Sequence, residues 1–428
     1  MLQTPVEKRE IGLTVLPNGL RVITEAMPQV RSVALGIWIA SGARREKPEQ
    51  NGLSHFIEHM VFQGTEKRSA EEIARSLDSL GGHLDAYTAK ELVSFSAKVL
   101  DQHLPIAFDV LADLVLHPLF REQDIEKEKK VVLEEIKMEA DSPEHLVHEL
   151  FCAHFWPGHA LGRPILGTKR SIQRFNRPMI QEFFREVYTP GNMLITAAGH
   201  LEHEQVVELA ERHFGDIPDG NQRVEDTAPV CRPHLEFKSK KSLGQVHLCL
   251  GVPAHRADHP LRYAAYVLNV LLGGGMSSRL FQKIREQRGL AYSVFSELTM
   301  FRDTGLLLVS AATSAEQTRE VVRLTLEEFR RFKEEPISSE ELERAKAQLK
   351  GSFMLSLEST ANRMANLARQ YLYYGRLFDL DEILQGIEQV TADQVQSLAQ
   401  EYFQSDKIAL TLLGDVSRVQ LSHSDLVC

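Results

Sequence analysis

The stretch from residue 51 to residue 64 reads NGLSHFIEHMVFQG and contains two histidines, His55 and His59, four positions apart. This spacing puts both imidazoles on one face of a helix. It is the spacing at which one zinc ion can take two neutral nitrogen ligands from a helix. Glu58 stands beside the second histidine, where its carboxylate can act on a metal-bound water rather than on the metal. The stretch therefore predicts a helix with a zinc-binding face.

Two interpretations of this motif compete. The chain has 17 histidines, so two can fall four apart by chance, and a surface helix with scattered histidines would look the same. The neighbouring residues favour a buried helix, because they make it apolar on most of its surface: Leu53, Phe56, Ile57, Met60, Val61 and Phe62. Unpaired polar groups on a buried helix are costly, and a metal supplies partners for them. The order H-x-x-E-H is that of the inverzincins, so a peptide-hydrolysing zinc enzyme is the leading hypothesis.

A catalytic zinc needs a third protein ligand and a fourth position that stays open for water. The charged segment 121–141 offers candidates, because Glu128, Glu135 and Glu139 fall almost on one line of a helical wheel, whereas Glu134 points away. Carboxylates on an apolar stripe are costly unless they are paired or bound to metal, which favours Glu135 over Glu134 as the ligand. The stripe consists of Ile125, Val131, Val132 and Ile136. The alternative is a solvated helix whose acids pair with Lys127, Lys129 and Lys130.

Length and composition limit the class of protein. With 428 residues, the chain is too long for one core, and two or more domains are expected. The formal net charge of −10 argues against a nucleic-acid binder. No apolar run approaches the length of a membrane span, and the first residues carry no secretory signal pattern, so we expect no membrane partner and a cytoplasmic location. The cysteines fit that location, because they are far apart and form no C-x-x-C: Cys152, Cys231, Cys249 and Cys428.

The order of predicted elements repeats in the two halves of the chain. An Asn18-Gly19 turn joins two strands, further strands are expected over 33–40, 83–88, 92–99 and 193–198, and helices over 104–116, 121–141, 144–155, 179–187 and 202–214. The second half has strands over 245–251, 291–299, 305–311 and 408–413, with helices over 260–272, 278–286, 315–333 and 338–357. This predicts an α+β protein with two tandem units, each a mixed sheet packed with helices. The second unit is a degenerate repeat, because Tyr263-Ala264-Ala265-Tyr266-Val267 falls where the first has the H-x-x-E-H motif.

We therefore expect three segments: an N-terminal zinc-binding catalytic domain at 1–215, a linker at 216–234, and a homologous C-terminal domain at 235–428. The linker prediction rests on the polar, Pro- and Gly-containing composition of that stretch.

With these residues in place, the chain resembles the M16 family of zinc peptidases, the group of pitrilysin, insulysin and the mitochondrial processing peptidases. The stretch 51–60 matches the zinc-helix motif of the family position by position. Leu133-Glu134-Glu135-Ile136 fits the run that carries the distal glutamate ligand, which makes Glu135 the match, and Glu128 matches a second glutamate that supports the site. The resemblance implies one zinc ion per chain, held by His55, His59 and Glu135. The length is similar to that of the M16B subfamily, whose half-size chains pair.

Two further stretches carry the resemblance in the second half. Gly273, Gly274 and Gly275 lie where the processing peptidases have a glycine-rich substrate loop, and Arg285 with Tyr292 is similar to an Arg/Tyr pair that contacts substrate. Without the resemblance, a tight turn and an ordinary amphipathic segment explain both stretches. Asp85, Ala86 and Tyr87 match the substrate-binding edge strand, although many family members have Asn where this chain has Asp85.

The family likeness implies a homodimeric zinc metalloendopeptidase that cleaves peptides or unfolded segments inside a chamber. Arg285 and Tyr292 of one chain would then reach the zinc of its partner. Two alternatives remain at this stage. One is a non-catalytic structural subunit similar to the core proteins of respiratory complex III, whose zinc motifs are typically eroded. The other is an active chain that pairs with an inactive paralogue.

Overall fold

The computed structural model describes residues 9–220 and 226–428 and divides into two compact units. The first unit comprises Met1–Met138, Arg163–Glu225 and Leu355–Asp379. The second comprises Glu139–Gly162, Asp226–Met354 and Leu380–Cys428. Each unit has its own sheet and its own hydrophobic core, which confirms the α+β class and the two mixed sheets packed with helices.

The first unit is built on a six-stranded sheet. Its strand order is β1 (Glu10–Val15), β2 (Arg21–Ala26), β6 (Met193–Gly199), β3 (Ser32–Ile39), β5 (Val93–Leu100) and β4 (His83–Thr88). The predicted Asn18-Gly19 turn joins β1 to β2 as an antiparallel hairpin. All neighbouring strands are antiparallel except β2 and β6, which run parallel. The strand β4 forms one edge of the sheet.

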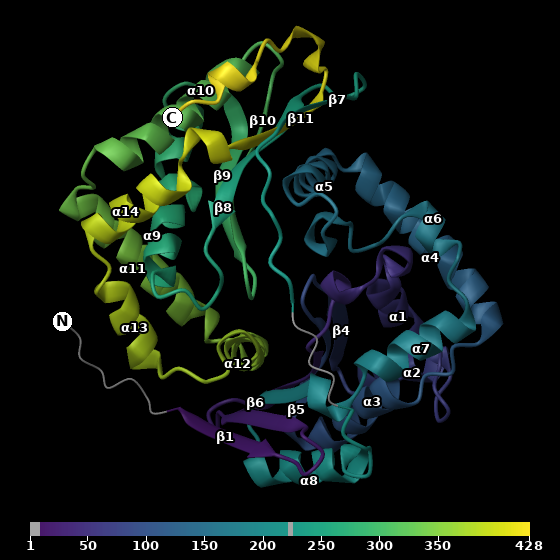
Figure 1. Ribbon diagram of the computed structural model, residues 1–428. Helices are drawn as coiled ribbons and strands as arrows, with labels where there is room; N and C mark the ends of the chain where they lie inside the picture. The colour runs from purple at the N-terminus through teal and green to yellow at the C-terminus, as the bar shows by residue number, and fades with distance from the viewer. Residues whose placement is uncertain (1–8, 221–225) are drawn as a thin grey trace. The chain divides into compact units, whose positions relative to one another are not determined.

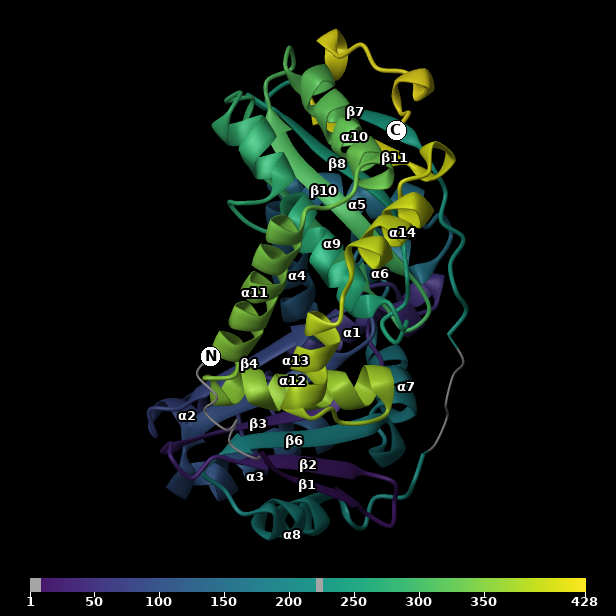
Figure 2. The same cartoon turned by 90° about the vertical axis from the view of Figure 1, so that its left-hand side faces the viewer.

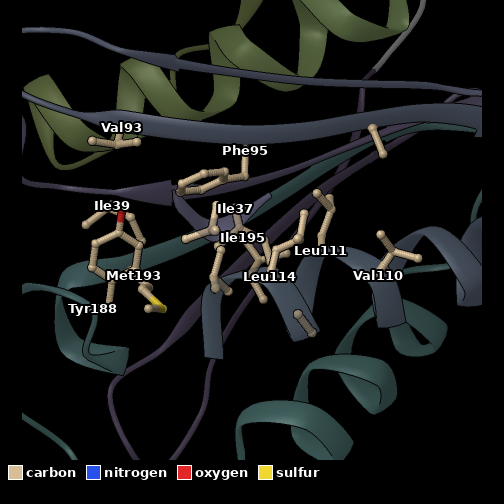
Figure 3. Close-up of a cluster of buried hydrophobic side chains, with 14 of the residues drawn as sticks. Ile37, Ile39, Val93, Phe95, Val110, Leu111, Leu114, Tyr188, Met193 and Ile195 are labelled. Carbon is tan, nitrogen blue, oxygen red and sulfur yellow. The ribbon is translucent and has the colours of Figure 1, made fainter. Parts of the chain in front are cut away.

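Helices cover both faces of this sheet (Figure 2). On one face, α1 (Leu53–Val61) packs against β4, α3 (Leu104–Leu116) against β3 and β5, and α8 (His203–Phe214) against β2. Figure 3 shows this core, in which Ile37, Phe95 and Ile195 of the sheet lie against Leu111 and Leu114 of α3. On the opposite face, α12 (Thr360–Tyr374) packs against β2, β3 and β6.

The second unit repeats this topology with five strands. The order is β7 (Leu235–Ser239), β11 (Ala409–Gly414), β8 (Val246–Ala254), β10 (Gly305–Thr313) and β9 (Ala291–Met300). The pair β7–β11 is parallel like β2–β6, and β11–β8, β8–β10 and β10–β9 are antiparallel like β6–β3, β3–β5 and β5–β4. The helix α9 (Arg262–Gly273) packs against β9 as α1 packs against β4. The second unit is thus the expected repeat of the first, without the H-x-x-E-H motif.

One helix from each half of the sequence belongs to the unit of the other half. The helix α5 (Pro143–Phe155) packs against β8 and β11 of the second unit, and α12 packs against the equivalent strands of the first (Figure 1). The compact units therefore differ from the expected contiguous domains 1–215 and 235–428. The physical reason is that the apolar side of each helix covers the sheet of the other half: Phe151 and Phe155 pack with Cys249 and Leu413, and Leu367 packs with Trp38. The expected linker 216–234 includes residues 221–225, which lie outside the described residues.

Most other expected elements form within a few residues of their predicted bounds. These include α4 (Glu122–Asp141), α7 (Arg177–Val187), α10 (Thr318–Glu334) and α11 (Ser339–Ser356). The helix α2 (Ala70–Asp78) lies between α1 and β4 in the chain. The segment expected as a helix over 278–286 contains a π-helix at Phe281–Glu286. The short strand β7 and three helices after residue 357 were not anticipated: α12, α13 (Leu380–Glu388) and α14 (Ala392–Tyr402). Across residues 9–220 and 226–428, no helix has both the length and the apolar content to cross a membrane.

A buried ion cluster ties α12 to the first sheet. The Glu25 carboxylate on β2 is fully buried, and Arg9 donates to it with Nε at 2.8 Å and Nη2 at 2.5 Å. Arg363 of α12 donates to the same carboxylate. Burial raises the pKa of Glu25, but the hydrogen bonds and charges of Arg9 and Arg363 outweigh this effect, so the pKa lies below its usual value. The carboxylate thus joins three segments that are distant in sequence.

Replacing Glu25 by Gln should lower the free energy of unfolding by about 3 kcal/mol, because it leaves buried guanidinium groups without their counter-charge. The folded-state pKa of Glu25 is lowered, so its contribution is present above the usual carboxyl pKa of 4.5 and is lost as pH falls through the folded-state value. Urea unfolding of both proteins, from pH 8 down to below the folded-state pKa of Glu25, measures the difference. Glu10→Gln, at an exposed position of β1, is the matched control and should change stability by less than about 0.5 kcal/mol. A Glu25→Gln protein as stable as the wild type at pH 7 would contradict the role of the cluster.

Candidate metal centre

The start of α1 is fixed by a buried carboxylate. Glu46 accepts hydrogen bonds from the backbone N–H of Gly52 at 2.7 Å and of Ser54 at 2.6 Å. Gly52 has φ of +95°, and a Cβ atom at this position would lie 2.7 Å from the Leu166 carbonyl oxygen, so only glycine fits. Burial raises the pKa of Glu46 despite these hydrogen bonds. The sequence analysis did not single out Glu46, which has no motif of its own.

The helix α1 separates an apolar side from a polar side. Leu53, Phe56, Ile57, Met60 and Val61 are buried in the core of the first unit. His55 is buried as well, and Glu58 and His59 are half-buried. The rings of His55 and His59 lie side by side, with their centroids 4.6 Å apart. The four-residue spacing therefore brings both imidazoles to one face.

The helix α4 brings the glutamates to the same place. Ile125, Glu128 and Val132 are buried on it, which agrees with the wheel. Val131 is a correction, because it is exposed rather than part of the stripe. It lies 60° from Glu128 on the solvent side, whereas Val132 lies 40° away on the core side. Glu134 points outward and pairs with Lys137. Glu139 bonds His145 at 2.5 Å instead of joining the site.

Three ligand atoms converge between α1 and α4. Glu135 Oε2 lies 3.6 Å from His55 Nε2 and 3.6 Å from His59 Nε2. The ligand atoms of His55, His59 and Glu135 all lie within 4.8 Å of one another, and among the described residues no other group of three or more His, Cys, Asp or Glu side chains meets this condition. Ligands about 2.1 Å from a tetrahedral zinc ion lie about 3.4 Å apart, so these separations fit zinc.

The carboxylate oxygen of this group lacks a hydrogen-bond partner. Glu135 Oε2 is buried and forms no hydrogen bond with any residue of the described chain. A buried carboxylate oxygen without a partner is costly, and a cation between it and the two imidazoles removes that cost. The contact with His55 lowers the pKa of the Glu135 carboxyl more than burial raises it. Glu135 is therefore in the ionised form that a metal requires.

Glu128 orients the second histidine. Its Oε1 accepts a hydrogen bond from His59 Nδ1 at 2.8 Å, which leaves Nε2 to face Glu135. Gln63 Nε2 donates to the other oxygen of Glu128 at 2.8 Å. Burial lowers the pKa of His59. The hydrogen bond to Glu128 and the charges of Glu128, Glu135 and Glu58 raise it by more, so the pKa of His59 lies above its usual value. Gln63 was missed in the sequence, although it stands four residues after His59, one helical turn further on.

Glu58 lies beside the ligand group but does not belong to it. Burial raises the pKa of its carboxyl above the usual value, although Thr88 and the two imidazoles act in the opposite direction. Thr88 Oγ1 donates a hydrogen bond to Glu58 Oε2 at 2.5 Å. The buried Tyr188 is affected by the charge of Glu58. Burial and this charge raise the pKa of the Tyr188 phenol. Neither Thr88 nor Tyr188 was singled out in the sequence.

The predicted substrate-binding residues of the first unit lie on β4. Asp85 and Tyr87 are exposed on one side of this strand, and Ala86 is half-buried on the other. Tyr87 packs edge-to-face on Trp38, with ring centroids 6.3 Å apart. Among residues 9–220 and 226–428, β4 pairs with β5 alone, so its second edge has the geometry that an additional strand requires.

The remaining predicted residues lie in the second unit. Gly273 ends α9 at a place where a Cβ atom would lie 2.4 Å from the backbone nitrogen of Ser296, so close packing on β9 explains this glycine. Gly274 and Gly275 follow it directly. The guanidinium of Arg285 lies 4.8 Å from the ring centre of Tyr292, which is 80% exposed. Tyr292 sits in a bulge, because Ala291 and Ser293 pair with consecutive residues of β10.

Comparisons with known proteins agree with this geometry. The family model described as "Insulinase (Peptidase family M16)" matches residues 21–169, and the one described as "Peptidase M16 inactive domain" matches residues 174–349. The "Uncharacterized zinc protease YmxG" of Bacillus subtilis (strain 168) is 42% identical over 398 residues, which cover 93% of this chain and 96% of that protein. The "Uncharacterized zinc protease SCO5738" of Streptomyces coelicolor is 37% identical and covers 96% of this chain and 91% of its own.

Solved structures share the fold. A protease from Helicobacter pylori superposes with a TM-score of 0.87 at 23% identity, over 95% of this chain and 99% of that chain. A protein from Pseudomonas fluorescens described as a peptidase M16 inactive domain gives a TM-score of 0.88 at 21% identity, over 96% and 99%. Two family models in tandem, relatives named zinc proteases over nearly the whole length and a metal-ligand set between α1 and α4 lead to one conclusion: the chain belongs to peptidase family M16.

Proposed function

We propose that this protein is a zinc metalloendopeptidase that cleaves peptides or unfolded segments. The observation that carries the proposal is the convergence of His55 Nε2, His59 Nε2 and Glu135 Oε2, with a separate carboxylate, Glu58, beside them. Two neutral nitrogens and one carboxylate form a ligand set of catalytic zinc sites. The names of the relatives, which are called zinc proteases, support the same reading.

In this proposal His55, His59 and Glu135 hold one zinc ion per chain. When bound, zinc supplies Lewis acidity, which acidifies water and polarises the carbonyl group of a peptide bond. Glu128 keeps Nδ1 of His59 protonated, so that Nε2 carries the lone pair that faces the ion.

Glu58 is the general base in this mechanism. Its Oε2 is occupied by the Thr88 hydroxyl, so Oε1 takes the proton from the attacking water. The same carboxyl then delivers the proton to the amine that leaves when the peptide bond breaks. Burial raises the pKa of Glu58 above its usual value, which suits a group that both accepts and donates a proton.

The peptide substrate is proposed to bind as an added strand along β4. Backbone hydrogen bonds at a free sheet edge hold an extended peptide independently of its sequence. Asp85 and Tyr87, which share one side of this strand, would contact its side chains, and Ala86 keeps the opposite side small. A binding mode of this kind selects extended or unfolded segments over folded proteins.

Arg285 and Tyr292 are proposed to act on the active site of a partner chain in a homodimer, in which two chains enclose a chamber. The exposed Tyr292 hydroxyl would donate to the oxyanion of the reacting carbonyl, a contact worth about 3 kcal/mol per donor in comparable sites. Arg285 stacks on the Tyr292 ring and limits its motion. Gly273, Gly274 and Gly275 would contact the substrate in the same chamber. The four cysteines, all of them among the described residues, are not joined in disulfides, which fits the proposed cytoplasmic location.

The ligand assignment predicts different effects for two adjacent glutamates. Glu135→Ala should reduce zinc affinity by more than the roughly 10- to 100-fold that loss of a supporting residue costs, because it removes a direct ligand. Glu134→Ala is the matched control, since its side chain is exposed and pairs with Lys137, and it should keep one zinc per chain. Metal content after dialysis against a graded zinc buffer measures both. Full zinc content in the Glu135→Ala protein would exclude Glu135 as a ligand.

The base assignment predicts loss of turnover without loss of metal. Glu58→Gln keeps the shape of the side chain but cannot take a proton, so cleavage should fall by about 10²- to 10⁴-fold. Zinc content and dimerisation should stay unchanged. Cleavage of a mixed peptide library with and without a chelator, read by mass spectrometry, gives the rates, and Glu134→Gln serves as the control. Near-normal turnover of Glu58→Gln would remove this residue from the mechanism.

The paired-chain proposal predicts complementation between two inactive variants. After subunit exchange between Glu58→Gln and Tyr292→Phe, half of the dimers are mixed and each has one intact site, so about a quarter of wild-type activity should return. The control is a mixture of Glu58→Gln with the double variant Glu58→Gln/Tyr292→Phe. This mixture should stay inactive, because no chain in it has Glu58. Exchange is verified with two mass-labelled chains. Confirmed exchange without any recovery would contradict action in trans.

A further inference from the structure

The general base is connected to the substrate-binding strand by one side chain. Thr88 is the last residue of β4, and its Oγ1 donates to Glu58 Oε2 at 2.5 Å. Both residues are half-buried, and a hydrogen bond to a charged acceptor is strong where solvent is partly excluded. No element other than β4 and α1 takes part in this contact, so the position of the strand and the orientation of the carboxylate depend on each other.

The alternation of β4 explains why the hydroxyl points at α1. Leu84 and Ala86 pack into the core of the first unit, whereas His83, Asp85 and Tyr87 are exposed. With a period of two, Thr88 shares the side of Leu84 and Ala86, which is the side that α1 covers. Threonine is also branched at Cβ, which restricts χ1 and keeps the hydroxyl in one direction.

The charges that surround Glu58 are of both signs. The charges of His55 and His59 attract the carboxylate, and the charge of Glu135 repels it. The terminal torsion of a glutamate is broad, so these forces alone do not select one orientation. The Thr88 hydroxyl, a donor held on the sheet, selects one orientation, because it fixes the position of Oε2 and so defines the position of Oε1.

We propose that Thr88 is a positioning residue that couples peptide binding along β4 to the orientation of the base Glu58. A peptide that pairs with the free edge of β4 restricts the motion of the end of this strand. The Thr88 hydroxyl is then held in place, and its hydrogen bond holds the Glu58 carboxylate in one orientation. The coupling acts on the chemical step rather than on affinity, because Thr88 does not contact the ligand atoms. This inference rests on the proposed peptidase function.

The test removes the hydroxyl and keeps the shape. Thr88→Val should lower kcat by roughly 10- to 100-fold, as loss of a hydrogen bond to a charged group predicts. KM for a peptide substrate should change less than about twofold, because the backbone edge of β4 is intact, and zinc should remain at one per chain. Thr88→Ser restores a hydroxyl and should recover most of kcat. A structural role alone would shift the melting temperature and would not produce this separation of kcat from KM.

Thr24→Val is the matched control. Thr24 is a buried threonine on β2 whose Oγ1 bonds His203 at 2.8 Å, and three strands separate β2 from β4. Loss of that hydroxyl should lower the melting temperature and leave kcat unchanged. If Thr88→Val does not fold, Thr88→Ser and Thr88→Ala provide the comparison, because this pair differs in the hydroxyl alone. The Ala protein should then be roughly 10- to 100-fold slower than the Ser protein.

A crystal structure of the metal-free Thr88→Val protein gives a readout that does not need turnover. The Glu58 side chain should leave its position or occupy two rotamers, while His55, His59 and Glu135 stay in place. An unmoved Glu58, or a Thr88→Val enzyme with wild-type kcat, would overturn the inference and leave the peptidase proposal intact. If the wild-type protein shows no chelator-sensitive cleavage, the peptidase proposal fails, and an unmoved or displaced Glu58 in the crystal still decides whether Thr88 positions this side chain.

Discussion

Glu135 and the two imidazoles of α1 meet because α1 and α4, more than sixty residues apart, are each held by apolar packing in one core. Ile57 and Met60 of α1 and Ile125 and Val132 of α4 belong to the same cluster of buried residues. A carboxylate oxygen buried beside that cluster without a partner is costly, so the placement of Glu135 favours a cation there. The Glu46 carboxylate fixes where α1 begins, and Glu128 fixes how His59 turns. The geometry of the site is therefore a consequence of core packing, with a few polar contacts that set its details.

The convergence of the candidate ligands could be predicted from the sequence because these residues follow helical periodicity. Both histidines lie one turn apart on a helix with a clear apolar side, and the wheel of α4 separates Glu135 from Glu134. The contacts made by Thr88, Gln63 and Glu46 could not be predicted in this way. Thr88 and Glu46 join a strand end and a loop to α1, and Gln63 joins the segment after α1 to Glu128 of α4. Residue spacing does not encode which side chain of another element lies opposite. Val131 shows the limit of placing a residue by its angular distance from Glu128 alone, since it lies on the solvent side of the stripe and is exposed.

The sheets were predicted better than the boundaries of the units. Alternation and turn residues gave most of the strands, and the repeated order of parallel and antiparallel pairs explains why the two halves look alike in sequence pattern. The destinations of α5 and α12 could not be read from the chain. An amphipathic helix shows that it has an apolar side but not which sheet it covers, and here each covers the sheet built by the other half. The sequence therefore led to contiguous domains, an expectation that leaves out the helix each half contributes to the unit of the other.

The placement of α12 has a consequence for synthesis on the ribosome. The strands of the first sheet are complete once Gly199 has emerged, but one face of that sheet stays uncovered until residues 360–374 follow. During that interval Trp38, Leu194 and other apolar side chains of this face are open to water and to neighbouring chains. At translation rates of about 5–20 residues per second, the delay is on the order of ten seconds. The nascent chain is thus exposed to aggregation or chaperone capture for a period set by the order of its segments rather than by the stability of the finished protein.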